Sequence, residues 1–142
     1  MKIKLLTPGC LPAYQSENDA AMDCRAAEYT EWYFDGTAYA AIVPLGFAVR
    51  VPKDHCLYLY SRSGHGFKHN ITLANAVGII DRSYRDELKV KLIQHGTTTK
   101  SPDPIQKSDR ICQMILAEAP RIYLKEVDDV GTGKSGFGSS GV

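Results

Sequence analysis

One acidic side chain stands where it could act on a bound water molecule. Asp81 directly follows the apolar run Gly78-Ile79-Ile80. A carboxylate at the edge of an apolar segment is a candidate general base, or a ligand of a metal-bound water. The stretch from Asp81 to Tyr84 also has the composition of a hairpin turn, with Asp as its natural opener. The two interpretations are compatible. Tyr84 could stack on a base or pack across a strand, and spacing favours neither role.

A second group of residues suits phosphate oxygens. In Arg62-Ser63-Gly64, the arginine offers a fork of fixed donors, the serine a hydroxyl, and the glycine a close backbone approach. An ordinary turn is the alternative interpretation. Further along the chain, Gln113 lies in an apolar strand, where a polar side chain needs a partner or a ligand.

Other charged residues admit simpler explanations. Asp23 could cap a turn or hold a metal-bound water. Asp109 and Arg110 are neighbours, and a local salt bridge between them is expected. The histidines show no spacing typical of a catalytic pair, so we expect surface or structural roles for His55, His65, His69 and His95.

The glycine-rich C-terminal segment imitates two nucleotide-binding motifs. Residues 131–136 satisfy the pattern GxGxxG, and Gly133-Lys134-Ser135 resembles the end of a P-loop. Both motifs require a preceding strand and a following helix, and residues 137–142 are too few for that helix. Such a segment can still bring backbone N–H groups close to phosphates. The alternative is a disordered tail, although the lone aromatic Phe137 could act as a lid.

Bulk composition indicates one ordinary soluble domain. The chain has 142 residues, 44% of them hydrophobic, and a net charge of +1. This balance predicts neither a nucleic-acid surface nor a membrane surface. Neither a signal peptide nor a membrane span is recognisable. The four cysteines show no zinc-like spacing and are expected to be reduced thiols, so we expect a cytoplasmic protein.

Short apolar runs separated by glycine and proline predict an all-β sandwich or barrel. Residues 38–51 are interrupted by Pro44 and Gly46, so two strands are expected there. The stretch 19–27 is rich in alanine but lacks the apolar stripe of a helix. We expect a β domain over residues 1–130 and a flexible tail over 131–142. The remaining predicted strands cover residues 3–6, 56–60, 88–93, 111–116 and 122–127.

Taken in order, these motifs resemble the five motifs of the trimeric dUTPase family from Asp19 to Gly141. Asp23 matches the aspartate of an AGxDL-like motif, and Arg62-Ser63-Gly64 matches RSG. The third motif, GxIDxxY, is matched by residues 78–84, with Asn75 upstream and Glu87 downstream. GDRIxQ is matched by Asp109-Arg110-Ile111 with Gln113, and GFGSTG by residues 136–141.

The chain departs from the family pattern at several positions. Ala21 and Ser108 stand where glycine is usual. Thr132 stands where the family's tail motif begins with an arginine that reaches the triphosphate. Lys134 is basic but cannot reproduce a bidentate guanidinium.

The resemblance implies a distorted jelly-roll or β-barrel of short strands, assembled as a homotrimer with three shared sites and a flexible glycine-rich tail. It implies hydrolysis of dUTP to dUMP and pyrophosphate with Mg²⁺, which keeps uracil out of DNA and supplies dUMP for dTMP synthesis. Asp81 would be the base, and Asp23 would hold a metal-bound water. The implied substrate-binding residues are Arg62, Ser63, Gly64, Asn75, Gly78, Tyr84, Lys89, Gln113, Lys134, Phe137, Gly138 and Ser139.

Two other functions fit a chain of this kind. A dCTP deaminase shares the fold and binds a related nucleotide, but the pairing of Asp81 with Tyr84 and the tail with Phe137 favour a dUTPase. A non-catalytic nucleotide sensor on the same fold is the other alternative, and Thr132 is the residue that favours it.

Overall fold

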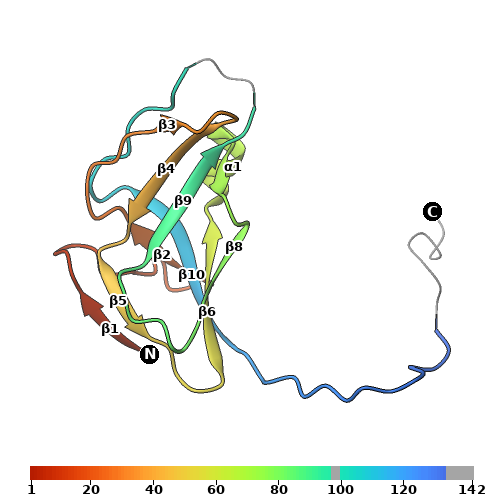
Figure 1. Ribbon diagram of the computed structural model, residues 1–142. Coiled ribbons are helices and arrows are strands. Elements are labelled where there is room, and N and C mark those ends of the chain that lie inside the picture. Colours follow the sequence, from red (N-terminus) through yellow and green to blue (C-terminus); the bar gives the residue numbers. More distant parts are fainter. Residues whose placement is uncertain (97–99, 134–142) are drawn as a thin grey trace.

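The computed structural model describes residues 1–96 and 100–133, which form three antiparallel sheets and one short helix (Figure 1). The two-stranded sheet pairs β1 (Lys2–Leu5) with β5 (Phe47–Arg50). One four-stranded sheet has the order β2 (Met22–Arg25), β10 (Arg110–Glu118), β6 (His55–Ser61) and β8 (Val77–Ile80). The other has the order β3 (Tyr33–Phe34), β4 (Tyr39–Pro44), β9 (Lys89–Gln94) and β7 (Ile71–Leu73).

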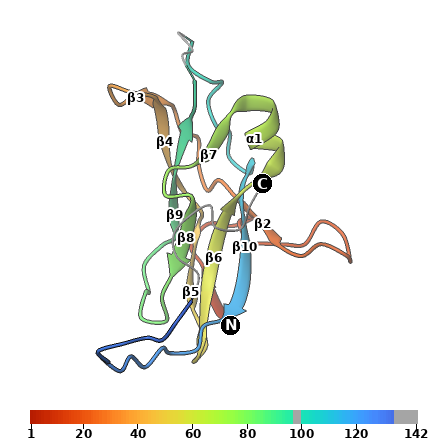
Figure 2. The ribbon, with the colours of Figure 1, turned by 90° about the vertical axis from the view of Figure 1, so that its right-hand side faces the viewer.

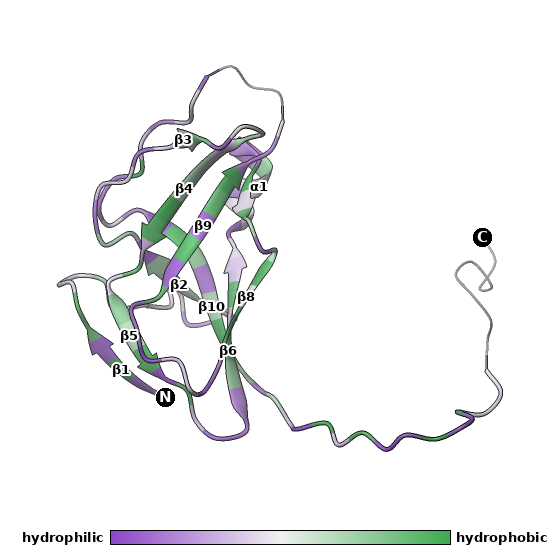
Figure 3. Cartoon of the chain, in the orientation of Figure 1, coloured by the Kyte–Doolittle hydropathy of each residue, from purple (hydrophilic) through white to green (hydrophobic). Residues whose placement is uncertain are grey.

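The strands enclose one hydrophobic core, and the alternation along β9 shows how (Figure 3). Val90 and Leu92 are buried, whereas Lys89 and Lys91 are exposed, as the period-two pattern predicts. Burying such side chains supplies the main driving force for folding, roughly 1.5–3 kcal/mol for each large one. The largest fully buried side chains are Phe47, Leu45, Leu57, Leu59, Leu88, Leu92, Ile111, Val43 and Val51.

The all-β fold class is therefore confirmed, with an open arrangement of sheets. Over residues 1–96 and 100–133, no hydrogen-bonded strand pair joins one four-stranded sheet to the other, so no closed barrel forms. The views in Figures 1 and 2 show an elongated body, with β6 and β10 side by side along its length.

Most predicted strands are confirmed, including the two expected in residues 38–51, which form β4 and β5. The prediction of a strand over residues 122–127 is wrong for this chain. That stretch belongs to the arm, residues 119–133, which leaves the body as an extended and largely exposed segment (Figure 1). A strand needs hydrogen-bonding partners for its backbone, and the described part of the chain offers none to residues 122–127.

The helix α1 (Ser63–His69) was not expected. Its seven residues include two glycines and no buried residue, so neither helix propensity nor an apolar stripe indicates it. It ends at Asn70, which adopts the left-handed conformation (φ 55°).

The cysteines are buried free thiols, as the sequence predicts. Cys24 and Cys112 are direct partners across β2 and β10. Their mutual hydrogen bond and burial raise the pKa of the Cys24 thiol well above its usual value. In the described residues, helix α1 is too short to cross a membrane, and no longer apolar helix is present.

Gly46 makes the turn between β4 and β5. It has φ +73°, and its carbonyl oxygen accepts hydrogen bonds from the N–H groups of Leu6 (2.8 Å) and Thr7 (3.0 Å). A Cβ atom at this position would lie 2.8 Å from Cβ and Sγ of Cys10 and 2.9 Å from Cβ of Thr7. Only glycine fits both the backbone conformation and the space.

We predict that Gly46→Ala destabilises the fold by about 3 kcal/mol or more, because backbone strain and overpacking add. Chemical denaturation measures the change. Gly36→Ala is the control, since Gly36 has φ +101° but a Cβ atom added there would meet nothing within 4 Å. If both variants lost the same free energy of unfolding, the packing of Gly46 against Cys10 would not be tight.

Candidate active site

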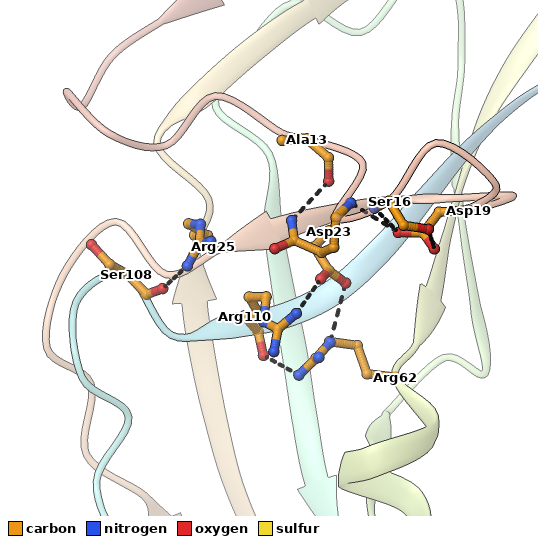
Figure 4. Close-up of polar contacts among 9 residues, drawn as sticks. Ala13, Ser16, Asp19, Asp23, Arg25, Arg62, Ser108 and Arg110 are labelled. Carbon is orange, nitrogen blue, oxygen red and sulfur yellow. Dashed lines mark hydrogen bonds and ion pairs between the residues drawn. The ribbon is translucent and has the colours of Figure 1, made fainter.

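A buried aspartate gathers two arginines where α1 begins (Figure 4). The Asp23 side chain is only 3% exposed. Its Oδ1 atom lies 3.2 Å from Nε of Arg62, and its Oδ2 atom lies 3.1 Å from Nη1 of Arg110. Arg62 also donates through Nη1 to the carbonyl oxygen of Arg110 (3.0 Å). The carboxylate thus holds two guanidinium groups next to each other.

Strand register explains this cluster. Gln113 on β10 is the partner of Asp23 on β2 and of Tyr60 on β6. Residues directly opposite in a sheet share a face, so these three side chains lie on one face. Arg62 follows Tyr60 by two residues, which keeps it on that face. The cluster therefore places the predicted phosphate-binding residues Arg62 and Gln113 together with Asp23.

Arg110 joins the cluster through an irregularity in β10. The register with β2 shifts between Arg110 and Cys112, and such a bulge redirects a side chain.

The prediction of a salt bridge between Asp109 and Arg110 is wrong. The Asp109 carboxylate instead accepts the N–H of Gln106 (2.9 Å), while Arg110 turns to Asp23. The sequence signal for Arg110 was its place in the fourth motif.

The loop before β10 explains one departure from the family pattern. Ser108 has φ +73°, a conformation that glycine adopts most readily. Its carbonyl oxygen accepts a hydrogen bond from Nη1 of Arg25 (2.8 Å). The chain tolerates serine at this position and holds the loop with a charged donor.

Ser63 and Gly64 are the first residues of α1, directly after Arg62. The N–H groups of His65 and Gly66 donate to the carbonyl oxygen of Arg62 (3.1 Å each), so the start of the helix is fixed to the arginine. Burial, followed by the nearby charge of Arg62, lowers the pKa of His65. The neutral imidazole therefore adds no further positive charge beside Arg62 and Arg110 at neutral pH.

A second group of predicted residues lies around two adjoining cavities between β8 and β9. Asp81, Tyr84 and Lys89 line a cavity of about 500 Å³. Asn75, Gly78 and Lys89 line the next one, of about 360 Å³. Both cavities share Lys89 with two isoleucines of β8, so they form one continuous surface.

Asp81 stands at the rim of the larger cavity. It is exposed, and its carboxylate has no hydrogen bond or ion pair with any residue in the described ranges. The turn is closed by the N–H of Tyr84, which donates to the carbonyl oxygen of Asp81 (3.2 Å). The Tyr84 hydroxyl donates to the carbonyl oxygen of Glu87 (3.0 Å), which leaves the ring facing the cavity.

The expectation of a hairpin at this turn is wrong. The turn connects β8 and β9, which belong to different four-stranded sheets. Apolar residues on both sides of the turn do not reveal which sheet each strand joins.

The two groups of residues are far apart within one chain. Ile80, the last residue of β8, pairs with Leu57 near the start of β6. Arg62 lies five residues beyond Leu57, just past the other end of β6. At about 3.3 Å per residue, this separates Asp81 from Arg62 by roughly 16 Å or more. One chain does not bring the carboxylate to the phosphate-binding group.

The tail residues predicted to touch substrate lie outside the described ranges. These are Lys134, Phe137, Gly138 and Ser139. The described arm that precedes them is exposed, with exposed fractions of 83% for Ile122, 92% for Leu124 and 94% for Val130.

Comparison with known proteins identifies the class. The family model described as dUTPase matches residues 7–141. The deoxyuridine 5'-triphosphate nucleotidohydrolase of Rickettsia rickettsii is 40% identical over all of this chain and 97% of its own length. The enzyme of the same name from Rhizobium rhizogenes is 38% identical over 93% of this chain and 85% of its own length.

Solved structures agree on the fold. The dUTPase of Staphylococcus bacteriophage 80alpha, solved with dUpNHpp, has a TM-score of 0.81 and 25% identity, covering 99% of this chain and 98% of that one. A mutant dUTPase of phage phi11 of S. aureus, with a structural Mg(II) ion, has a TM-score of 0.76 and 19% identity, covering 92% and 98%. The fold is thus that of nucleotide-hydrolysing enzymes. The chain belongs to the dUTPase family, whose members cleave dUTP to dUMP and pyrophosphate.

We predict that Asp23→Asn lowers the free energy of unfolding by about 2 kcal/mol, since it leaves two guanidinium groups adjacent without their counter-charge. This value is reduced for screening, because the Arg110 side chain is 42% exposed. The Michaelis constant for dUTP should also rise. Asp19→Asn, in an exposed loop, is the control and should change both quantities much less. Wild-type stability and kinetics in Asp23→Asn would show that the carboxylate does not hold the arginines.

Proposed function

We propose that this enzyme hydrolyses dUTP by Mg²⁺-assisted, in-line attack of water on the α-phosphorus, in sites shared between chains of a homotrimer. The observation that carries the proposal is the unpaired carboxylate of Asp81 at the rim of a 500 Å³ cavity. Asp81 would orient the attacking water and accept its proton. Nothing in the described chain competes for the carboxylate by hydrogen bonding.

The phosphate chain would lie against the cluster at the far end of β6. Arg62 supplies a guanidinium already fixed by Asp23, so little side-chain entropy is lost when phosphate binds. Ser63, Gly64 and Gln113 would contribute a hydroxyl, a close backbone approach and an amide. Preorganised donors of this kind stabilise charge that develops on phosphate oxygens.

The nucleoside would occupy the two adjoining cavities. Asn75 and the backbone at Gly78 would read the uracil edge, and Lys89 lies at the junction of the cavities. The Tyr84 ring would pack on the deoxyribose and leave no room for a 2′-hydroxyl. Its hydroxyl is already satisfied by Glu87, which suits a packing role.

The described residues fit a magnesium ion that is bound to the phosphates of the substrate. They fit less well an ion that is coordinated only by protein side chains. In the described ranges, no group of three or more carboxylate, histidine or cysteine side chains could hold a metal. Mg²⁺ typically keeps several waters and binds substrate phosphates. Asp23 uses one position on each oxygen for arginine, so its remaining lone pairs could hold a water of that ion. The ion would neutralise phosphate charge.

Several features support a shared site. Asp81 and Arg62 are separated along β6, and a second chain would supply the group that each one lacks. The exposed arm, residues 119–133, carries apolar side chains that a neighbouring chain could cover. The proposed trimer would take the phosphate-binding group from one chain, the Asp81 group from another and the tail from the third.

The tail would close over the bound nucleotide. Phe137 would cover the uracil, while Gly138, Ser139 and Lys134 would meet the phosphates. Ordering the tail costs about 1–2 kcal/mol per residue for the backbone. Charge-assisted contacts of ~1.5–3 kcal/mol each must offset that cost. Because Thr132 stands in place of an arginine, Lys134 would have to supply more of these charge-assisted contacts to the phosphates.

The biological role would follow from the reaction. Hydrolysis of dUTP keeps uracil out of DNA, and the dUMP produced serves dTMP synthesis. We propose that this takes place in the cytoplasm, without nucleic-acid or membrane partners.

We predict that Asp81→Asn keeps dUTP binding within about threefold of wild type but lowers kcat by about 10²–10⁴, the usual worth of a general base. Calorimetric titration with a non-hydrolysable dUTP analogue and a pyrophosphate-release assay measure the two quantities. Asp86→Asn is the matched control, because Asp86 lines the same cavity. Near-normal turnover in Asp81→Asn would rule out Asp81 as the base.

A further inference from the structure

Glu87 attaches the turn that carries Tyr84 to the body of the protein. It makes two hydrogen bonds through different groups. Its main-chain carbonyl oxygen accepts the Tyr84 hydroxyl (3.0 Å), and its side-chain Oε1 accepts the N–H of Gly46 (3.0 Å). Glu87 therefore connects the ring that lines the nucleoside cavity to the turn between β4 and β5.

Gly46 is a fixed point of attachment. Its carbonyl oxygen accepts the N–H groups of Leu6 and Thr7 on one side of the turn. Cys10 and Thr7 lie so close that not even a Cβ atom would fit beside it. A position packed this tightly cannot follow a moving turn, so the bond from Glu87 holds the turn in place instead.

The turn has few other attachments to the body. Residues 81–86 are all exposed, and the first buried residue after them is Leu88. Within residues 81–87, the Tyr84 and Arg85 side chains donate only to carbonyl oxygens of the same segment. In the described part of the chain, Glu87 is the one residue of this segment whose side chain bonds to another part of the body.

We propose that Glu87 is a positioning residue that acts through Tyr84 to exclude ribonucleotides. Deoxyribose and ribose differ by one hydroxyl group, so a ring that excludes ribose by contact must not move away from the sugar. A binding group is held this closely only when neighbouring hydrogen bonds fix its position. The inference rests on the proposed function, in which the Tyr84 ring packs on the deoxyribose.

The bond to Gly46 requires an acceptor and not a negative charge. Glu87→Gln keeps a carbonyl oxygen at the same reach and should preserve the bond, whereas Glu87→Ala leaves the N–H of Gly46 without this partner. Glu87→Asp keeps the charge but shortens the reach, and it serves as a second disrupting variant if Glu87→Ala does not fold. Asp86→Ala is the matched control, because Asp86 lines the same cavity and has no hydrogen bond or ion pair in the described ranges.

The test compares hydrolysis of dUTP and UTP by the full-length enzyme. For Glu87→Ala and Glu87→Asp, we expect the ratio of kcat/KM for dUTP to that for UTP to fall about tenfold, as loss of one hydrogen bond predicts. Glu87→Gln and Asp86→Ala should keep the ratio within about twofold of wild type. A general loss of stability, or a shift of Asp81, lowers the activity toward both nucleotides alike and leaves the ratio unchanged.

A spectroscopic measurement on the ligand-free protein reports on the ring itself. The NMR signal of ring-labelled Tyr84 is assigned with Tyr84→Phe. In Glu87→Ala and Glu87→Asp, this signal should shift toward that of free tyrosine, and in Glu87→Gln it should stay as in wild type. Because no nucleotide is needed, a shifted signal in a protein that does not hydrolyse dUTP would count against the proposed function and support the positioning of the ring by Glu87.

Three results would overturn the inference. The first is an unchanged ratio for dUTP and UTP in the disrupting variants. The second is an equal fall of the ratio in Glu87→Gln or in Asp86→Ala, which would show that the hydrogen bond to Gly46 is not the cause. The third is a Tyr84 signal in Glu87→Ala that is identical to that of wild type.

Discussion

The buried carboxylate of Asp23 is the constraint on which the site depends. A charge removed from water to this extent is tolerated only when it is paired and hydrogen-bonded. The two partners come from different places, Arg62 from the end of β6 and Arg110 from the start of β10. One carboxylate therefore ties three strands together at the point where α1 begins, and fixes the direction of the guanidinium that would meet phosphate.

The same strand that positions Arg62 keeps it away from Asp81. β6 runs between them, with Arg62 beyond one end and Asp81 beside the other. A rigid antiparallel ladder cannot shorten, so no local motion brings the two together. The arm, which leaves the body at the end of β10, lies at the Asp81 end (Figure 1). The fold thus places the two groups of candidate residues at opposite ends of one strand, and the proposed association of chains would reunite them.

Sequence reasoning succeeded where a residue's environment is local. The alternation of Val90 and Leu92 with lysines predicts β9, and Pro44 with Gly46 predicts the break between β4 and β5. It failed where the outcome depends on distant partners. The pairing of Arg110 with Asp23 spans most of the chain and depends on a bulge, so the neighbour Asp109 was the wrong partner. The apolar pattern of residues 122–127 is that of a strand, but a strand requires an edge to pair with, and the described part of this chain gives it none.

The central claim, a site assembled from more than one chain, is tested most directly by mixing two inactive variants. Asp81→Asn and Arg62→Ala are combined in equal amounts, unfolded together and reassembled, and dUTP hydrolysis is measured. In a trimer with shared sites, each mixed assembly has one intact site of three, and about three-quarters of random assemblies are mixed. The account predicts recovery to about a quarter of wild-type activity. Activity no higher than that of the separate variants would show that each site lies within a single chain.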